Sequence, residues 1–387
     1  MGFFKFEKSI RMEIELRLIR FVEIIKTLVY KQSPEIIEKV DYENDDAFLE
    51  PLLFSYFNSK KNDEFPKESL EEILQGYFIK KEKIKLKYSF NKNDVAYVPK
   101  VGYFKKGESV PFENIKLIFN TRIELIKHKM IHLKYVFRDF SENIIDEDLI
   151  EISSTLNNQF IKKLENAFSY IKKYCPDHYK LIEQCCKKVV LFKTNPENTN
   201  SFATIKAHGM AFFNVYQDDN DEVFFVDDIA HQTGHIILTT LLFERKKYFL
   251  IDKNQNLSSI LNDDKEYRSF YILFHALYTY YTTLLCLDNC IESNCFNQKQ
   301  NHEAKARIGF YLKKYNSDLR KLYKIANYYG GFTKILSKNA IPVFKTVNNK
   351  YLNMEEKWKT VVKKFNYDNQ PYNFTYKKFI KLNPLKN

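Results

Sequence analysis

Apolar residues recur every three or four positions along several long stretches of the chain, the spacing that gathers them on one face of an α-helix. Gly330 and Gly331 follow the last turn of one such stretch, and glycine is favoured just beyond a helix C-terminus. The chain is therefore predicted to be predominantly helical. The predicted helices cover residues 10–31, 117–140, 148–174, 264–289, 302–329 and 354–365.

Shorter apolar runs bounded by turn-forming residues predict a few β-strands. The polar run at 217–222 separates two of them and suits a hairpin loop. A helix follows directly and runs to about residue 243, and either Asp227 or Asp228 is placed to cap its N-terminus. We therefore expect a predominantly helical α+β protein in which a small antiparallel sheet or hairpin precedes this helix. The predicted strands cover residues 83–89, 95–101, 187–192, 209–216 and 223–226.

The domain organisation has only weak signals, because the chain contains no internal repeat and no flexible low-complexity linker. Residues 1–110 are predicted as an N-terminal region of helices and strands that could bind a peptide. Residues 111–345 are predicted as a helical domain with an H-x-x-x-H motif, and residues 346–387 as a polar, aromatic tail.

Composition places the chain among globular proteins, with 44% hydrophobic and 28% charged residues in 387. No stretch reaches the length of apolar sequence that a membrane helix needs, and the N-terminus does not read as a signal peptide. We therefore expect a cytoplasmic protein with no membrane partner. The net charge of +12 comes from lysines spread along the chain among other polar and apolar residues, a compositional bias that does not predict nucleic-acid binding.

Two pairs of histidines have the i, i+4 spacing that places both rings on one face of a helix, where they can bind one metal ion. His128 and His132 lie among lysines and have no downstream partner, so we expect surface or packed side chains there. His231 and His235 fall in a predicted helix, and His275 lies on the next long one. These three histidines predict a metal site with open positions, although hydrogen-bonded core histidines remain the alternative.

The residue between the second pair limits the chemistry. Metallopeptidases with the H-E-x-x-H motif use its Glu as the general base, but Gln232 stands at that position and an amide has no useful basicity. Hydrolysis is therefore disfavoured, whereas a non-haem iron(II) oxygenase needs no such base. A 2-oxoglutarate cosubstrate would need a cation, for which Arg268 and Arg307 are candidates; solvated surface arginines are the alternative.

Residues 225–235, around the histidine pair, and residues 266–278, around Arg268 and His275, together resemble the motif regions of the HExxH-domain peptide-maturation family. The resemblance covers residues 205–330, about a third of the chain. Some members of that family are iron(II)/2-oxoglutarate-dependent peptide β-hydroxylases that act on ribosomally made precursor peptides of natural-product pathways.

The resemblance implies that His231, His235 and His275 bind iron(II) and that Arg268 holds 2-oxoglutarate. Gln232 departs from the family's Glu, but its amide can still hydrogen-bond a ligand or a water beside the metal. The expected function is a dioxygenase that hydroxylates the β-carbon of a residue in a precursor peptide, its only expected partner. The alternative is a non-catalytic peptide-binding or scaffolding relative, and a metal-dependent hydrolase is less favoured.

Overall fold

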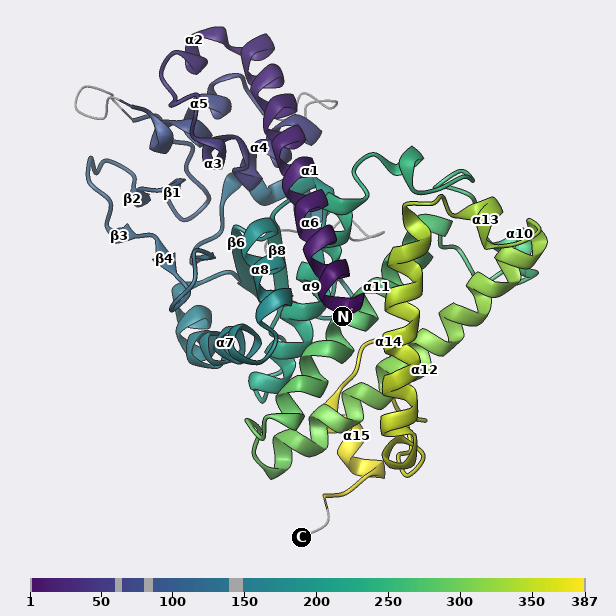
Figure 1. Cartoon of the computed structure of the whole chain (residues 1–387). Helices are drawn as coiled ribbons and strands as arrows, with labels where there is room; N and C mark the ends of the chain where they lie inside the picture. Colours follow the sequence, from purple (N-terminus) through teal and green to yellow (C-terminus); the bar gives the residue numbers. More distant parts are fainter. Residues whose placement is uncertain (1, 60–64, 80–85, 139–148, 386–387) are drawn as a thin grey trace. The chain divides into compact units, whose positions relative to one another are not determined.

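The computed structural model describes residues 2–59, 65–79, 86–138 and 149–385 (Figure 1). The chain forms two compact units built from interleaved segments. Unit 1 comprises Met1–Ile10, Asn166–Lys180 and Asn220–Asn387, and unit 2 comprises Arg11–Glu165 and Leu181–Asp219. The predicted division at residues 110 and 345 used contiguous segments and stays a prediction.

The secondary structure confirms the predominantly helical α+β fold. The α-helices are α1 (Gly2–Gln32), α2 (Pro34–Ile37), α3 (Asp45–Phe48), α4 (Pro51–Ser59), α5 (Glu68–Leu74), α6 (Lys134–Arg138), α7 (Ser154–Tyr174), α8 (Pro176–Cys185), α9 (Glu222–Leu241), α10 (Ser258–Leu261), α11 (Phe270–Glu292), α12 (Gln298–Tyr328), α13 (Phe332–Ile335), α14 (Ala340–Val362) and α15 (Tyr376–Leu382). The strands are β1 (Val95–Val98), β2 (Gly102–Lys105), β3 (Glu113–Asn114), β4 (Lys116–Leu117), β5 (Glu124–Ile126), β6 (Lys188–Phe192), β7 (Phe202–Ala203) and β8 (Met210–Asn214).

Unit 2 contains both sheets. A small antiparallel sheet has the order β1-β2-β3, and a larger mixed sheet has the order β4-β5-β6-β8-β7. In the larger sheet β5, β6 and β8 are parallel, while β4 and β7 pair antiparallel at the edges. Every residue of β6 and β8 is buried, which is typical of strands covered on both faces. The buried Lys188 ammonium of β6 is satisfied by Glu124 at 2.7 Å and Glu50 at 3.2 Å.

Unit 1 is helical, and four long helices make its core (Figure 1). α9 packs against α11, α11 against α12, and α12 against α14. By length and composition α11 could cross a membrane, and 78% of its most apolar stretch is buried inside the structure. A buried core helix has the same composition as a membrane span, so the predicted cytoplasmic location stays a prediction.

Most predicted elements correspond to observed ones. The helices predicted at 10–31, 264–289 and 302–329 are α1, α11 and α12, and the strands predicted at 187–192 and 209–216 are β6 and β8. Four further predictions match in part. The helix predicted at 148–174 begins at Ser154, the one at 354–365 begins at Ala340, the strand at 95–101 covers β1 and its turn, and the helix ending near 243 ends at Leu241.

The long helix predicted at 117–140 is wrong over its described residues. The segment instead contains the end of β4, then β5 and α6, and residues 139–140 lie outside the described part of the chain. Thr121 closes a turn, because its hydroxyl donates to the Ile118 carbonyl at 2.9 Å and accepts from the Ile123 backbone N–H at 3.0 Å. β5 then pairs with β6. A short apolar run is compatible with either a helix or a strand, and here pairing with a distant strand makes it a strand.

The strand and hairpin predicted at 223–226 are also wrong, because these residues form the first turn of α9. Asp221 caps this helix, with its side chain accepting a hydrogen bond from the Val223 backbone N–H at 2.9 Å. The cap predicted at Asp227 or Asp228 is therefore wrong as well. Four consecutive apolar residues cover every side of a helical turn and show neither helical nor strand periodicity. The antiparallel pair that precedes α9 is β7 with β8.

The strand predicted at 83–89 is tested only at its end. Residues 86–89 form no strand, and residues 83–85 lie outside the described residues.

Candidate functional site

Two packed helices of unit 1 carry the three predicted ligands. His231 and His235 lie one turn apart on α9, and His275 lies on α11. Gly234 allows the close approach of the helices, since a Cβ there would lie 2.7 Å from the Thr282 Oγ1 atom of α11. The Thr282 hydroxyl also donates to a backbone carbonyl of α9 at 2.9 Å. Glycine inside a helix is less stable than alanine by about 1 kcal/mol. Here the missing side chain lets the histidine-bearing faces of α9 and α11 pack closely.

His235 and His275 face each other between these helices. Their Nδ1 atoms are 3.4 Å apart, and their rings are nearly parallel, at an angle of 13° with centroids 5.7 Å apart. This separation suits a hydrogen bond from one Nδ1–H to the other nitrogen. It also suits two nitrogens bound to one metal ion, for which each metal–nitrogen bond is about 2.0–2.1 Å.

His231 adjoins this pair and lies among aromatic side chains. Its ring centroid is 5.2 Å from that of His235, 5.9 Å from that of Tyr280 and 5.8 Å from that of Tyr311. The His231 Nδ1 and His275 Nε2 atoms are buried and have no hydrogen-bond partner among the described residues. Buried polar atoms normally have a partner, so these two nitrogens are candidates to receive a ligand. We call His231, His235 and His275 the histidine centre.

Burial keeps the histidine centre uncharged. It lowers the pKa of His235 to about 4 and the pKa of His231 and His275 well below the usual histidine value. Neighbouring positive charge adds to the effect, from Lys314 at His231 and from Arg245 at His275. Neutral imidazoles retain the lone pair that binds a transition metal, so the donors are ready at neutral pH.

The three rings are not arranged as a complete set of ligands for one metal ion. In the part of the chain that the structure describes, no group of three or more His, Cys, Asp or Glu side chains is arranged to hold a metal ion. The geometry therefore consists of one close pair, His235 and His275, with His231 beside it. The fit to one metal ion rests on that pair and on the unpartnered Nδ1 atom of His231.

The Gln232 side chain forms a hydrogen bond within its own helix, α9. Its Nε2 donates to the Asp228 Oδ1 atom one turn earlier at 3.2 Å, and both side chains are buried. The amide thus holds a carboxylate of α9, a role that needs no base. Its predicted position beside the metal ligands stays a prediction.

Arg268 is bound by two carboxylates. Its guanidinium donates to both oxygens of Asp318, at 2.8 and 2.7 Å, and to both oxygens of Glu266, at 2.8 and 2.7 Å. Lys321 also reaches Glu266 at 2.5 Å. Although burial alone would raise it, the hydrogen bonds from Arg268 and Lys321 hold the pKa of Glu266 at about 2.

Arg307 is bound in the same way, but more deeply. It is 4% exposed and donates to Asp227 of α9 at 2.7 Å and to Glu303, one turn earlier on α12, at 2.9 and 2.7 Å. Burial raises the pKa of Asp227, and it raises the pKa of Glu303 to about 7, against the opposing effect of Arg307. Each predicted cosubstrate arginine therefore already has two internal carboxylate partners, which gives both a structural role.

Lys314 is a cation beside the histidine centre that the sequence did not single out. Burial lowers its pKa to about 8, and its positive charge depresses the pKa of His231. Its ammonium donates to the Tyr372 backbone carbonyl at 2.6 Å and lies 3.8 Å from the Tyr372 ring centroid. The signal that could have found it is a helical stripe of polar residues along α12. This stripe comprises Glu303, Arg307, Tyr311, Lys314 and Asp318.

The other histidine pair does not form a comparable arrangement. His128 precedes the short 3-10 turn that contains His132, so the two rings do not share a helical face. The His128 Nε2 atom is 2.6 Å from a Glu113 oxygen, whereas His132 is buried and its pKa is lowered to about 4. Each ring is packed in its own surroundings, as predicted.

Comparison with known proteins adds no family to this geometry. The sequence matches no protein-family model, and no curated protein matches it significantly.

Proposed function

We propose that the protein is an iron(II)- and 2-oxoglutarate-dependent oxygenase that hydroxylates a peptide side chain. The observation that carries the proposal is the close approach of the His235 and His275 Nδ1 atoms, 3.4 Å apart on neutral rings. His231, one turn before His235, is the candidate third ligand. Two or three histidines that leave positions open are typical of non-haem iron sites.

The absence of a base at Gln232 favours oxygenation over hydrolysis. Hydrolysis at such a site needs a carboxylate to activate the metal-bound water, and Gln232 is engaged with Asp228. The proposed reaction consumes 2-oxoglutarate, dioxygen and a substrate C–H group and forms succinate, carbon dioxide and a C–OH group. Bound iron would supply the activation of dioxygen, with 2-oxoglutarate as its two-electron reductant.

Lys314 is a candidate to bind an anionic cosubstrate near the histidines, as is Arg245, whose charge acts on His275. The positive charge of Lys314 acts on His231, whereas Arg268 and Arg307 are each held by two carboxylates. Among the described residues Lys314 has no carboxylate within ion-pair distance. The ammonium–carboxylate attraction would be strong in this setting, because the side chain is largely removed from water.

Anaerobic titration with iron(II) in the presence of 2-oxoglutarate tests the proposal through the weak visible charge-transfer band of the chelate. The full-length protein is expected to develop the band, and His235→Ala is expected to bind iron about 100-fold more weakly or worse, since a direct ligand is lost. The matched control is His128→Ala, which removes one histidine of the other pair in unit 2 and is expected to retain the band. Metal content measured after gel filtration gives a second readout that requires no peptide substrate.

The same titration decides between the proposal and a non-catalytic peptide-binding protein. Gln232 and the two fully paired arginines favour this alternative. A full-length protein that retains no iron and develops no band would contradict the oxygenase, as would a His235→Ala variant that binds iron as the unmodified protein does.

A further inference from the structure

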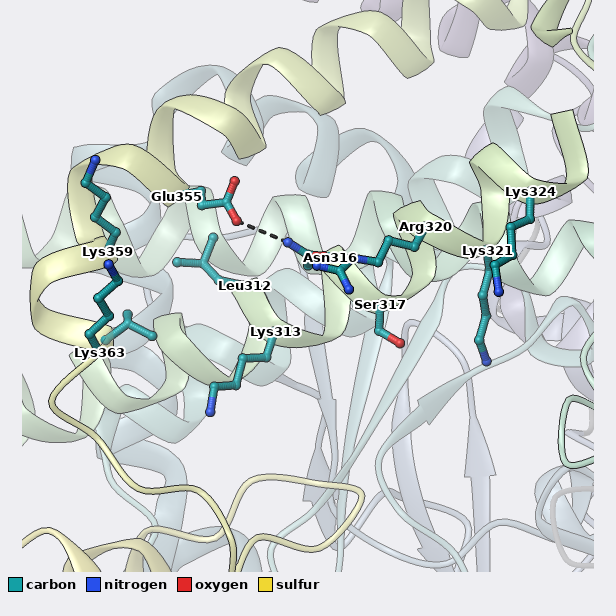
Figure 2. Close-up of a pocket in the computed structure, with 11 residues that line it drawn as sticks. Leu312, Lys313, Asn316, Ser317, Arg320, Lys321, Lys324, Glu355, Lys359 and Lys363 are labelled. Atoms are coloured by element: carbon teal, nitrogen blue, oxygen red, sulfur yellow. Dashed lines mark hydrogen bonds between the residues drawn. The ribbon is translucent and has the colours of Figure 1, made fainter. Parts of the chain in front are cut away.

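We propose that a groove between α12 and α14 is a binding site for an acidic peptide segment. The groove has a volume of about 520 Å³ and lies entirely within unit 1 (Figure 2). We call it the basic groove, because six of its eleven lining residues are Lys or Arg and only one is acidic. The basic residues are Lys313, Arg320, Lys321, Lys324, Lys359 and Lys363.

The positive charge runs along the whole groove. Figure 2 shows Lys359, Lys363 and Lys313 towards one end and Lys321 and Lys324 towards the other. The lining positions of α12 extend from residue 312 to residue 324, which corresponds to about 18 Å of helix. An extended peptide of about five residues covers this length and can place acidic side chains at both ends.

Several of these cations lack a partner that would neutralise them. Within the described residues, Arg320, Lys324 and Lys363 have no carboxylate within ion-pair distance, whereas Lys321 is paired with Glu266 and Lys359 with Glu356. Like charges in one groove repel each other, and an anionic ligand relieves this repulsion. The groove therefore has positive potential that the protein itself leaves uncompensated.

The single acidic residue of the groove is already satisfied. The Glu355 Oε1 atom accepts from the Tyr351 hydroxyl at 2.7 Å. It also accepts from the Asn316 amide at 3.2 Å (Figure 2). Tyr351 is buried and stacks on Tyr315 with ring centroids 4.0 Å apart, so the aromatic pair lies beneath the polar surface. Glu355 is thus held by its own helix and its neighbour, which leaves the cations to face a ligand.

The other lining residues favour a peptide over a nucleic acid. Leu312 and Val362 supply apolar contacts, and the aliphatic stems of the lysines extend this apolar surface. None of the eleven lining residues is aromatic, although aromatic stacking on bases is the usual means of binding single-stranded nucleic acid. Alternating apolar and carboxylate side chains match the groove in both shape and charge.

Fluorescence anisotropy of the full-length protein tests the proposal, with a labelled peptide of alternating glutamate and leucine as the probe. The variant Arg320→Glu/Lys324→Glu/Lys363→Glu reverses three cations that have no described ion-pair partner, so it breaks no internal salt bridge. We expect its affinity for the peptide to fall by about tenfold or more, because three favourable charge contacts become repulsive. The matched control is Lys246→Glu/Lys338→Glu/Lys377→Glu, which makes the same change in net charge at exposed lysines outside the groove and is expected to bind within about twofold of the unmodified protein.

The outcomes separate a specific site from general attraction. An equal loss of affinity in both triple variants would overturn the proposal, as would a full-length protein that does not bind the peptide. Tighter binding of a labelled oligouridine of equal charge, with the same sensitivity to the groove variant, would assign the groove to nucleic acid instead. His235→Ala is expected to bind the peptide normally, so the result does not depend on the proposed iron site. Thermal unfolding of both triple variants verifies that each remains folded.

Discussion

The histidine centre and the basic groove belong to the same unit but differ in their exposure to solvent. The histidines are partly or fully buried, and burial keeps them neutral, whereas the groove holds exposed cations of which three lack a described carboxylate partner. α12 lies beside both regions, since its Tyr311 ring is 5.8 Å from that of His231 and its Arg320 lines the groove. The helix carries Arg307 on its buried side and Arg320 on its exposed side. The comparison shows that the surroundings, more than the residue type, decide whether a basic side chain is structural or available to a ligand.

Replacing each of these two arginines by alanine makes the comparison quantitative and should give the largest effect. Arg307→Ala removes the partner of two buried carboxylates, Asp227 and Glu303, and is expected to lower the free energy of unfolding by about 3–5 kcal/mol. Arg320→Ala, on the same helix, is expected to change it by no more than about 0.5 kcal/mol. Chemical denaturation followed by circular dichroism measures both.

A stable Arg307→Ala variant that fails to bind 2-oxoglutarate would support the predicted role of Arg307 in binding the cosubstrate. If Arg307→Ala unfolds like the unmodified protein but no longer binds 2-oxoglutarate in the iron titration, the arginine serves the cosubstrate and its carboxylate contacts are secondary. Arg307→Lys refines the result, because lysine keeps the charge but cannot donate to Asp227 and Glu303 together in the fork geometry of a guanidinium.

The same two regions show what the sequence could predict. His231 and His235 were found because their spacing acts within one helix, and the structure places His275 against His235. Asp318 and Asp227 were missed as partners of Arg268 and Arg307, because they lie on other elements and no spacing along the chain relates them. The other two partners, Glu266 and Glu303, lie two and four residues from their arginines, so local spacing could have indicated them. The basic groove was missed although four of its cations are spaced to share one face of α12, because its other wall forms only when α12 and α14 pack together.

The secondary structure was likewise predictable where the signal is local and not where it depends on distant residues. Long amphipathic helices such as α12 were predicted because many turns repeat the pattern. The segment at 223–226 was misassigned because a four-residue apolar run carries no period, and the decisive signal was the cap at Asp221. The segment at 117–140 was misassigned because pairing of β5 with β6 depends on a strand more than sixty residues away.

Salt sharpens the comparison with a smaller expected effect. Raising the ionic strength from about 50 mM to about 500 mM shortens the Debye length severalfold, so the affinity of the basic groove for the acidic peptide should fall by about tenfold. Iron(II) binding by the histidine centre should change by less than about twofold, because its ligands are neutral and largely shielded from solvent ions. Anisotropy and the iron titration measure the two in one buffer series. Equal salt sensitivity would contradict the distinction between a neutral and a charged site.

The smallest expected effect concerns the cation that lies beside the neutral site. Lys314 has a pKa lowered by burial to about 8, below the usual lysine value of 10.5, so its ammonium loses its proton as the pH rises through about 8. Since only the protonated form attracts an anion, the affinity for 2-oxoglutarate should decrease on going from about pH 7 to about pH 9. A bound carboxylate stabilises the ammonium and raises its pKa, so the loss should be limited to about fivefold.

Lys314→Met should bind 2-oxoglutarate weakly at both pH values, and Lys313→Met, the neighbouring exposed lysine, should keep the pH dependence of the unmodified protein. A Lys314→Met variant that retains the pH dependence would show that another group binds the cosubstrate.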